Sequence, residues 1–419
     1  MKRVAITGVG AVTPLGNDMA TTWRGLVDGR GGISALRTFD ASTFPVRIAA
    51  QVNGFDAVRR LGRSTARKLS RAAGFAVAAA DEAVRAADVQ PTDGSQWCKG
   101  VCLAGTVGRA ELTELVGMAE DVLAGRYRRQ APAVVVRRDQ SFVSAFIARR
   151  HGFAGPVVNI STACAGAANA VGEGLRMIRA GECDVVLAGG YDSLTTWLDV
   201  LGFSLLGALA AGWENDPAAA SRPFSADRNG FVLGEGAVVL LLEDWDRAHA
   251  RGATVHAELA GYGSTLNAYR VTDSPPDGGG AIEAMRLAIQ DAGARPNLVD
   301  YVVAHGTGTP GNDASETVAI KEVFGEHAGA LCVSSPKSMT GHLTSAAAGV
   351  NLIAALGALR TGLIPPTVNL RRPDPALDLD FVPLTARARQ VETVLVNAFA
   401  FGGTNASLVV RSTRGGCRD

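Results

Sequence analysis

The sequence predicts an α/β fold of layered, largely parallel sheets, built from two related halves of the 419-residue chain. Short apolar runs alternate with longer helix-like stretches along the whole chain. Several of these runs show no polar alternation, which is typical of strands buried on both faces. One arrangement of strand, small-residue turn and helix also occurs twice, which favours an internal duplication.

The predicted strands are short and rich in Val, Ile, Leu and Ala. They include Arg3–Ile6, Val101–Ala104, Val157–Ile160, Val185–Ala188, Val238–Leu242, Tyr301–Ala304, Leu331–Val333 and Val394–Asn397. The predicted helices include Ser64–Ala87, Ala163–Ala180, Gly280–Ala292 and Ala314–Val323. Polar, proline-containing loops are expected at Glu214–Arg228 and Val271–Gly280, and the tail Ser412–Asp419 is expected to fray.

The repeated unit suggests where the two halves meet. VVNISTACAGAANAVGEGLRMIRAG is followed by the strand DVVLAGG, and LCVSSPKSMTGHLTSAAAGVNLIAALGALRTG is followed after a loop by TVLVNAFAFGG. Each unit contains a strand, a turn of small residues, a helix of small residues, a strand and a glycine turn. We therefore predict an N-terminal half at residues 1–255 and a C-terminal half at residues 256–419.

The composition narrows the functional classes. Hydrophobic residues make up 47% of the chain, charged residues 19%, and the formal net charge is +1. This charge gives no global field for nucleic acid or an anionic membrane. No signal peptide is recognised, and Leu343–Leu359 is short and polar enough to be a buried helix. Without a recognised signal peptide, we expect a cytoplasmic protein, in which disulfides are not needed. Cys98 and Cys102 have no second pair or nearby histidines to complete a zinc site, so we expect no metal.

Cys164 is a candidate nucleophile. It stands in NISTACAGAANAVG, where a strand ends near Ile160 and a helix of small residues begins. The positive end of a helix dipole favours the thiolate, and the small neighbours Ala165 and Gly166 allow a substrate to approach. A buried inert cysteine is the alternative reading of this segment alone.

Two histidines also follow apolar strands. His305 stands in VDYVVAHGTGTPGND and His342 in SSPKSMTGHLTSAAAG, each before a helix. A histidine at the end of a buried strand is well placed for a site, and Lys337, five residues before His342, would help to keep an imidazole neutral. The alternative for His305 is a histidine buried in the core. The alternatives for His342 and Lys337 are a residue at the start of a helix and a solvated loop charge.

The segment NAFAFGGTNAS at residues 397–407 ends in a glycine pair. Gly402 and Gly403 permit positive φ and the close approach of a ligand to the backbone. An ordinary turn before the last strand is the alternative. Together, one thiol and two imidazoles at strand ends in a duplicated α/β chain predict one composite site.

These segments resemble the β-ketoacyl-acyl-carrier-protein synthases of the elongating type, from bacterial fatty-acid and type II polyketide systems. The resemblance covers nearly the whole chain, from RVAITGVGAVTPLG through SRPFSADRNGFVLGEGAVVLLLE to AHGTGTPGND, SSPKSMTGH and NAFAFGGTN. It implies a thiolase fold with two pseudo-repeated halves in αβαβα layers, usually a dimer. The partners implied are an acyl carrier protein and a second, identical or chain-length-factor-like subunit, without a cofactor of the enzyme's own.

The resemblance also implies roles for individual residues. Cys164 would take the acyl chain, while His305 and His342 would assist decarboxylation of malonyl-carrier protein. Lys337 and Glu316 would form a supporting polar pair behind the histidines, and the backbone N–H groups of Cys164 and Phe401 an oxyanion hole. The remaining implied positions are a gate (Phe399, Ala400, Phe401 and Gly402), contacts to the phosphopantetheine arm (Thr307 and Thr309) and the malonyl site (Phe231).

A basic segment is a candidate docking patch for the acidic carrier protein. GRSTARKLSR places Arg63, Arg67, Lys68 and Arg71 on a predicted helix start, and the spacing of four brings the three arginines onto one face of that helix. A solvated helix face is the alternative. Docking contacts of this kind mostly steer association.

The chain departs from the family pattern at three places. The segment from Thr106 to Gly155 matches poorly and contains APAVVVRRDQSFVSAFIARRHG. Ala400 replaces a common glycine, and Ala165–Gly166 replaces a more usual hydroxyl-bearing pair. These departures suggest a specialised polyketide or polyene pathway.

Three other functional classes fit the sequence less well. A coenzyme A thiolase needs a late catalytic cysteine, but Cys417 stands in a ragged tail and Cys332 within a predicted strand. A non-catalytic chain-length-factor-like subunit would lack the nucleophile. A cysteine hydrolase would need an acidic residue that turns a histidine into a strong base, and none is evident.

Overall fold

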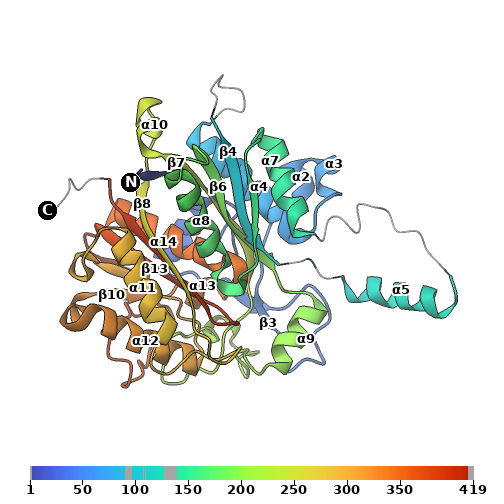
Figure 1. The fold of residues 1–419 in the computed structure, drawn as a ribbon. Helices are drawn as coiled ribbons and strands as arrows, with labels where there is room; N and C mark the ends of the chain where they lie inside the picture. Colours follow the sequence, from blue (N-terminus) through green and yellow to red (C-terminus); the bar gives the residue numbers. More distant parts are fainter. Residues whose placement is uncertain (1, 90–96, 107, 109, 127–138, 414–419) are drawn as a thin grey trace.

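A computed structural model describes residues 2–89, 97–106, 108, 110–126 and 139–413 (Figure 1). Its centre is a ten-stranded mixed sheet in the order β10-β9-β13-β14-β8-β1-β7-β6-β4-β5. The strands are β1 (Val4–Val12), β4 (Lys99–Gly105), β5 (Val157–Ile160), β6 (Val185–Ser193), β7 (Glu235–Asp244), β8 (Ala257–Leu266), β9 (Tyr301–Val303), β10 (Cys332–Ser334), β13 (Thr393–Phe399) and β14 (Thr404–Arg411).

The sheet consists of two halves with the same topology. In each half the outermost strands are parallel, as in β5-β4-β6 and β10-β9-β13. Two antiparallel neighbours follow, β7 and β1 in one half and β14 and β8 in the other. The halves join where β1 pairs antiparallel with β8. The predicted fold class is confirmed, but the sheet is mixed and continuous, because in each half antiparallel strands follow the three parallel ones.

Helices complete a five-layer αβαβα arrangement. Helices α4 (Arg71–Ala87) and α7 (Gln140–His151) pack with one apolar cluster against the first half of the sheet. Helices α11 (Gly279–Asp291) and α12 (Pro310–Phe324) pack with another cluster against the second half. Between the two halves lie α8 (Gly166–Arg179) and α14 (Ala347–Thr361) in the central core.

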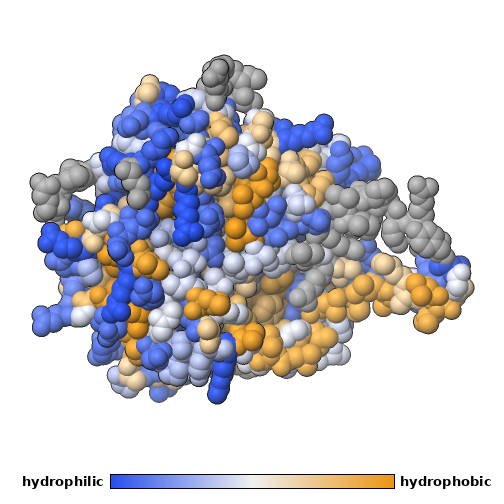
Figure 2. All heavy atoms as spheres, viewed as in Figure 1, coloured by the Kyte–Doolittle hydropathy of each residue, from blue (hydrophilic) through white to orange (hydrophobic). Residues whose placement is uncertain are grey.

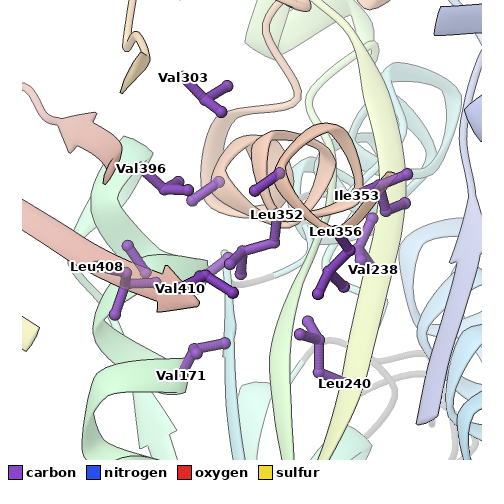
Figure 3. Packing of buried hydrophobic residues seen from close by; sticks show 14 of the residues in the cluster. Val171, Val238, Leu240, Val303, Leu352, Ile353, Leu356, Val396, Leu408 and Val410 are labelled. Atoms are coloured by element: carbon purple, nitrogen blue, oxygen red, sulfur yellow. The ribbon is translucent and has the colours of Figure 1, made fainter. Parts of the chain in front are cut away.

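Helix α14 is apolar on all sides because it lies between the two halves of the sheet. Leu352, Ile353 and Leu356 are buried near Val238 of β7 and Val410 of β14 (Figure 3). The buried helix predicted within residues 343–359 is therefore confirmed. None of the helices in the part of the chain that the structure describes is long and apolar enough to cross a membrane.

The helix predicted at Ser64–Ala87 is interrupted. A short helix α3 (Arg63–Ala66) ends at Arg67, and α4 begins after Ser70, whose side chain accepts a hydrogen bond from the backbone N–H of Ala73. A serine N-cap of this kind satisfies an otherwise unpaired donor at the start of a helix. The break matters for the basic segment discussed below.

The remaining elements are short or peripheral. They are α1 (Met19–Val27), α2 (Ala57–Leu61), α5 (Leu112–Leu123), α9 (Trp197–Leu205), α10 (Trp245–Ala250), α13 (Lys337–Thr340), the 3₁₀ turns η1 (Ala163–Ala165), η2 (Pro217–Ala219), η3 (Pro296–Leu298), η4 (Gly325–Ala330) and η5 (Thr344–Ala346), and the strand pairs β2 (Ile33–Ala35) with β3 (Ile48–Ala50) and β11 (Leu363–Ile364) with β12 (Arg387–Ala388). Helix α5 projects from the body of the molecule (Figure 1). Apolar residues gather on it and over the region of α9 (Figure 2); the exposed ones on α5 include Val122 and Leu123.

Candidate active site

One cavity of about 240 Å³ brings together residues from both halves of the chain. Cys164, His305 and His342 all line it, although they lie far apart in the sequence. The two imidazole centroids are 5.4 Å apart and their planes are nearly perpendicular. The composite site predicted from the strand ends is thus assembled in the structure.

Cys164 lies in the 3₁₀ turn η1, immediately after β5 and before α8. The preceding residue, Ala163, has a φ of 44°, a left-handed conformation that costs energy for any residue with a Cβ. The sharp turn leaves the Cys164 side chain half-buried at the cavity wall.

The thiol of Cys164 is held in its protonated form. Burial raises its pKa to about 11, and the positive charge of Lys337 and the backbone N–H of Phe401 only partly oppose this rise. The expectation that the helix start would favour the thiolate is therefore outweighed by desolvation. Proton removal has to accompany attack on a substrate.

His305 follows β9, and its backbone is held from both sides. Glu316 accepts hydrogen bonds from the backbone N–H groups of His305 and Gly306, each at 2.8 Å. Lys337 donates to the backbone oxygen of His305 at 2.5 Å, and its Nζ lies 3.4 Å from His305 Nδ1. The predicted pair of Lys337 and Glu316 therefore surrounds His305 through hydrogen bonds. Burial lowers the pKa of the His342 imidazole, and Lys337 acts on that ring through its charge, which lowers the pKa further.

His342 is held differently. Its backbone N–H donates to the oxygen of Val232 at 2.7 Å, and its Nδ1 accepts from the backbone N–H of Thr344 at 3.2 Å. Because Nδ1 is an acceptor, the neutral ring carries its proton on Nε2. The ring of Phe231 packs edge-on against His342, with centroids 5.3 Å apart.

Both imidazoles are neutral at physiological pH. Burial, followed by the charge of Lys337, places the pKa of His305 and that of His342 well below the usual 6.5. Burial also lowers the pKa of Lys337 to about 8, although the nearby Glu316 opposes this change. The site thus offers two neutral N–H donors that keep their protons beside a thiol.

The segment with the glycine pair closes one side of the cavity. Phe399, Ala400 and Phe401 line it, and Phe399 lies 5.7 Å from His305 between ring centroids. Gly402 has a φ of 87°, and its N–H donates to the Val271 oxygen at 2.7 Å. The expected positive φ is present there, whereas Ala400 keeps the negative φ that an alanine requires.

Three further predicted positions line the same cavity. Thr307 and Thr309 are linked through their hydroxyl groups at 2.9 Å, and Phe231 lies against His342. Thr307 also donates its backbone N–H to the buried carboxylate of Asp313 at 3.1 Å. These contacts hold the hydroxyl groups at the cavity wall, where they can meet a polar substrate.

The four basic residues of the predicted docking patch are exposed, but they do not form one helical face. That geometric prediction is wrong because α3 ends before Arg67 and α4 starts at Arg71. Arg71 is bound to the buried carboxylate of Glu235, which sets it apart from Arg63, Arg67 and Lys68. Arg71 therefore has a structural partner.

Two buried carboxylates near the site were missed from the sequence. Asp313 accepts backbone N–H bonds from Thr307, Gly308 and Phe224 and lies 3.7 Å from Arg228. Asp192 stands at the end of β6 and accepts from the Thr344 hydroxyl. The pattern that identified the histidines could have identified both residues. Asp192 is a polar residue at the end of a buried strand, and Asp313 lies in the first turn of the helix that follows β9.

The late cysteines give no second thiol in the cavity within the described chain. Cys332 is buried in β10, and Cys417 lies outside the described residues. The divergent segment is also described only in part, because residues 107, 109 and 127–138 lie outside the described ranges. Among the described residues no cluster of three or more His, Cys, Asp and Glu side chains has metal-binding geometry.

Comparisons with known proteins agree with this architecture. Residues 1–248 match the family model of the β-ketoacyl synthase N-terminal domain, and residues 256–371 match that of the C-terminal domain. A 3-oxoacyl-[acyl-carrier-protein] synthase 2 of Synechocystis sp. is 39% identical over 410 residues, which cover 98% of each chain. The mitochondrial 3-oxoacyl-[acyl-carrier-protein] synthase of Arabidopsis thaliana is 41% identical over 435 residues, covering 98% of this chain and 93% of that one.

Solved structures give the same result. The ishigamide ketosynthase/chain length factor superposes with a TM-score of 0.90 at 34% identity, covering 98% of this chain and 99% of that one. A ketosynthase solved with its type II PKS acyl-carrier protein and bound to the hexaketide superposes with a TM-score of 0.87 at 32% identity, with the same coverage. On its sequence, its thiolase fold and these relatives, the chain belongs to the β-ketoacyl synthase family.

Proposed function

We propose that this protein is a β-ketoacyl-acyl-carrier-protein synthase that joins an acyl chain held on Cys164 to a malonyl unit. The observation that carries the proposal is the single cavity in which Cys164 faces two buried, neutral histidines. A thiol supplies covalent capture, and two N–H donors supply stabilisation of a developing oxyanion.

In the first half-reaction the Cys164 sulfur attacks the acyl thioester of a carrier protein. The new S–C bond forms as the carrier's S–C bond breaks, and the thiol proton ends on the departing sulfur. The negative charge on the carbonyl oxygen would be stabilised by the backbone N–H groups of Cys164 and Phe401. The Phe401 N–H already points at the Cys164 sulfur, which supports this placement.

In the second half-reaction the malonyl thioester loses CO₂. The electron pair of the broken C–C bond forms an enolate, whose oxygen would accept hydrogen bonds from His305 and His342. The carbanion attacks the Cys164 thioester, a C–C bond forms as the C–S bond breaks, and the sulfur leaves as a thiolate that takes up a proton from solvent. Each preorganised donor of this kind typically contributes roughly 3–4 kcal/mol to the transition state.

Lys337 and Glu316 would act on this reaction through His305. Glu316 holds the backbone N–H of His305, and Lys337 holds its carbonyl oxygen and lies beside Nδ1. The chemistry of thioester exchange and decarboxylation needs no metal or organic cofactor of the enzyme's own. The substrates would arrive on the phosphopantetheine arm, with Thr307 and Thr309 as its contacts.

We propose that the partner delivering both substrates is an acyl carrier protein. The relatives are named as acyl-carrier-protein synthases, and one solved neighbour is a ketosynthase in complex with its acyl-carrier protein. The exposed Arg63, Arg67 and Lys68 fit an acidic partner, whereas Arg71 is engaged by Glu235. Reversing Arg67 and Lys68 to glutamate should raise KM for the carrier substrate and leave kcat nearly unchanged.

A second ketosynthase-like chain, identical or of the chain-length-factor type, is the second proposed partner. Strand β5 is one of the two edge strands of the ten-stranded sheet, and Val157 on it is 40% exposed. Helix α5 carries exposed apolar residues, among them Val122 at 73% and Leu123 at 87%. Open edges and apolar helices of this kind are usually covered. Native mass spectrometry of the chain alone will distinguish a homodimer from a subunit that needs another partner.

The two halves at residues 1–255 and 256–419, the cytoplasmic location and the specialised pathway remain proposals. The pathway proposal rests on the divergent segment from Thr106 to Gly155 and on Ala165, Gly166 and Ala400. Rapid turnover of ordinary saturated acyl-carrier proteins, with no preference for unsaturated or oxygenated chains, would contradict it.

The deciding experiment follows acyl-carrier protein and malonyl-carrier protein by intact-protein mass spectrometry, with Cys164→Ala alongside. The proposal requires an acyl adduct on the wild-type chain only, and then a carrier-bound chain longer by one extender unit. An adduct without elongation points to a missing partner or another extender. The absence of an adduct across a varied acyl panel would refute the role of Cys164.

A further inference from the structure

Asp192 is a buried carboxylate that connects the first half of the chain to the turn behind His342. It lies at the end of β6 and is 1% exposed. One of its oxygens accepts from the Thr344 hydroxyl at 2.5 Å and from the Ser345 N–H at 3.1 Å. The other accepts from the Thr106 hydroxyl at 2.5 Å and from the Ser193 N–H at 3.1 Å. Burial raises the pKa of Asp192, and the hydrogen bonds that its carboxylate accepts from Thr106, Thr344 and Ser345 oppose this rise.

The turn that Asp192 binds is strained. Thr344 has a φ of 45°, which is an outlier conformation for a β-branched residue. Such a conformation persists only where surrounding contacts enforce it. Asp192 supplies two of these contacts, because it binds the side chain of Thr344 and the backbone of the next residue.

The strained residue is also the one that contacts the catalytic ring. The backbone N–H of Thr344 donates to His342 Nδ1 at 3.2 Å. This bond places the ring proton on Nε2, and His342 lines the cavity. We propose that Asp192 is a positioning residue for His342, because its carboxylate fixes Thr344 so that the N–H of Thr344 sets the tautomer and orientation of the imidazole.

The two histidines would then depend on different supports. His305 is held by Glu316 and Lys337, both from the second half of the chain. His342 depends on a carboxylate from the first half, reached across the central layer through Thr344. Loss of Asp192 should therefore affect His342 and leave His305 in place. The predicted effect on the reaction rates rests on the proposed function, whereas the predicted tautomer of His342 rests only on the hydrogen bond from Thr344.

The test compares Asp192→Asn, Thr344→Val and Thr344→Ser. In wild-type protein labelled with ¹⁵N-histidine, long-range NMR spectra should show His342 as the Nε2–H tautomer, assigned by loss of its signals in His342→Gln. Thr344→Ser keeps the hydroxyl and should preserve this spectrum. Asp192→Asn and Thr344→Val should produce a mixture of tautomers for His342 and an unchanged His305.

The kinetic measurement separates the two half-reactions. Asp192→Asn and Thr344→Val should each lower the rate of malonyl decarboxylation by about 10- to 100-fold, the usual range for residues that orient a functional histidine. Acylation of Cys164 should stay within about threefold of wild type, because His342 serves the second step. The double variant should be no slower than the worse single variant, since both act through one contact.

Glu243→Gln is the matched control. Glu243 is fully buried in β7 and accepts a hydrogen bond from the Thr7 hydroxyl at 3.1 Å. It lies seven residues along β7 from Gly236, the partner of Asp192, which is roughly 23 Å at strand spacing. It should lower the unfolding temperature without changing the tautomer of His342. An unchanged tautomer in folded Thr344→Val, or equal losses in both half-reactions, would overturn the proposal. Wild-type protein with the predicted tautomer but no decarboxylation would refute the proposed function instead.

Discussion

The two halves of the chain use the same turn for different purposes. In the first half, β5 leads through residues 161 and 162 into η1, where Ala163 has a φ of 44° and Cys164 follows. In the second half, η5 begins at Thr344 with a φ of 45°, and Ser345 takes the place that corresponds to Cys164. Each turn leads into a helix of the central layer.

The difference lies in what comes before the turn. Residues 335–343 separate β10 from η5, and this longer connection contains Lys337 and His342. The first turn presents its own side chain to the cavity, whereas the second buries Ser345 and presents a histidine from the connection. Turns of the same geometry therefore provide the nucleophile in one half and an anchored support in the other.

Exchanging the side chain at each turn should give the largest contrast. Cys164→Ala should abolish condensation, a loss of at least about 10⁴-fold, because it removes the covalent step. Ser345→Ala should keep the condensation rate within about threefold of wild type, because the backbone N–H of residue 345 still donates a hydrogen bond to Asp192. Steady-state condensation assays with both carrier substrates measure the two effects. A large loss in well-folded Ser345→Ala would show that the second turn also acts in the chemistry.

The two histidines should give the next largest effects. His305→Ala and His342→Ala should each slow decarboxylation by about 10²- to 10³-fold, as expected for loss of one oxyanion donor. Acylation of Cys164 should change by less than about tenfold. Release of CO₂ and acyl-adduct formation are measured separately on the same preparations. If either variant blocks acylation as strongly as decarboxylation, that histidine serves the first half-reaction as well.

Acid should destabilise the protein through the same pair. The pKa values of His305 and His342 are held well below 6.5 by burial, whereas in the unfolded chain both titrate near 6.5. Below that pH the unfolded state binds protons that the folded state cannot. The free energy of unfolding should therefore decrease as the pH is lowered, by about 1.4 kcal/mol per histidine for each pH unit below 6.5.

Urea unfolding at pH 7.5 and 5.5 measures this effect. The double variant His305→Gln/His342→Gln is the control, because it removes both titrating rings and keeps polar groups of similar size. Its stability should depend less steeply on pH than that of wild type. Equal slopes would mean that the imidazoles become protonated within the folded protein, and that the two donors are not held neutral.

The candidate side chains at the strand ends were predictable from the sequence, but the buried carboxylates that hold the surrounding turns and side chains in place were not. An apolar strand followed by a cysteine or histidine reveals a candidate side chain from local sequence alone, as for Cys164 and His305. The antiparallel strands of each half were missed because they are buried along all or most of their length and lack the polar alternation that usually marks an antiparallel strand. The contacts of Asp192 with Thr344, and of Arg71 with Glu235, depend on tertiary pairing, which no local pattern encodes.

The smallest effects should come from relieving strain at the two turns. Replacing a residue in the left-handed region by glycine removes steric strain but increases the entropy of the unfolded chain, so the net change is about 1 kcal/mol or less. Ala163→Gly should therefore leave the free energy of unfolding nearly unchanged or slightly raised, because its methyl group makes no hydrogen bond. Thr344→Gly has the same backbone benefit but loses the hydroxyl that Asp192 binds, and it should lower that free energy by about 1–3 kcal/mol. Urea unfolding of both variants measures the difference, and an equal response at the two positions would show that the bond to Asp192 adds nothing to the stability of the second turn.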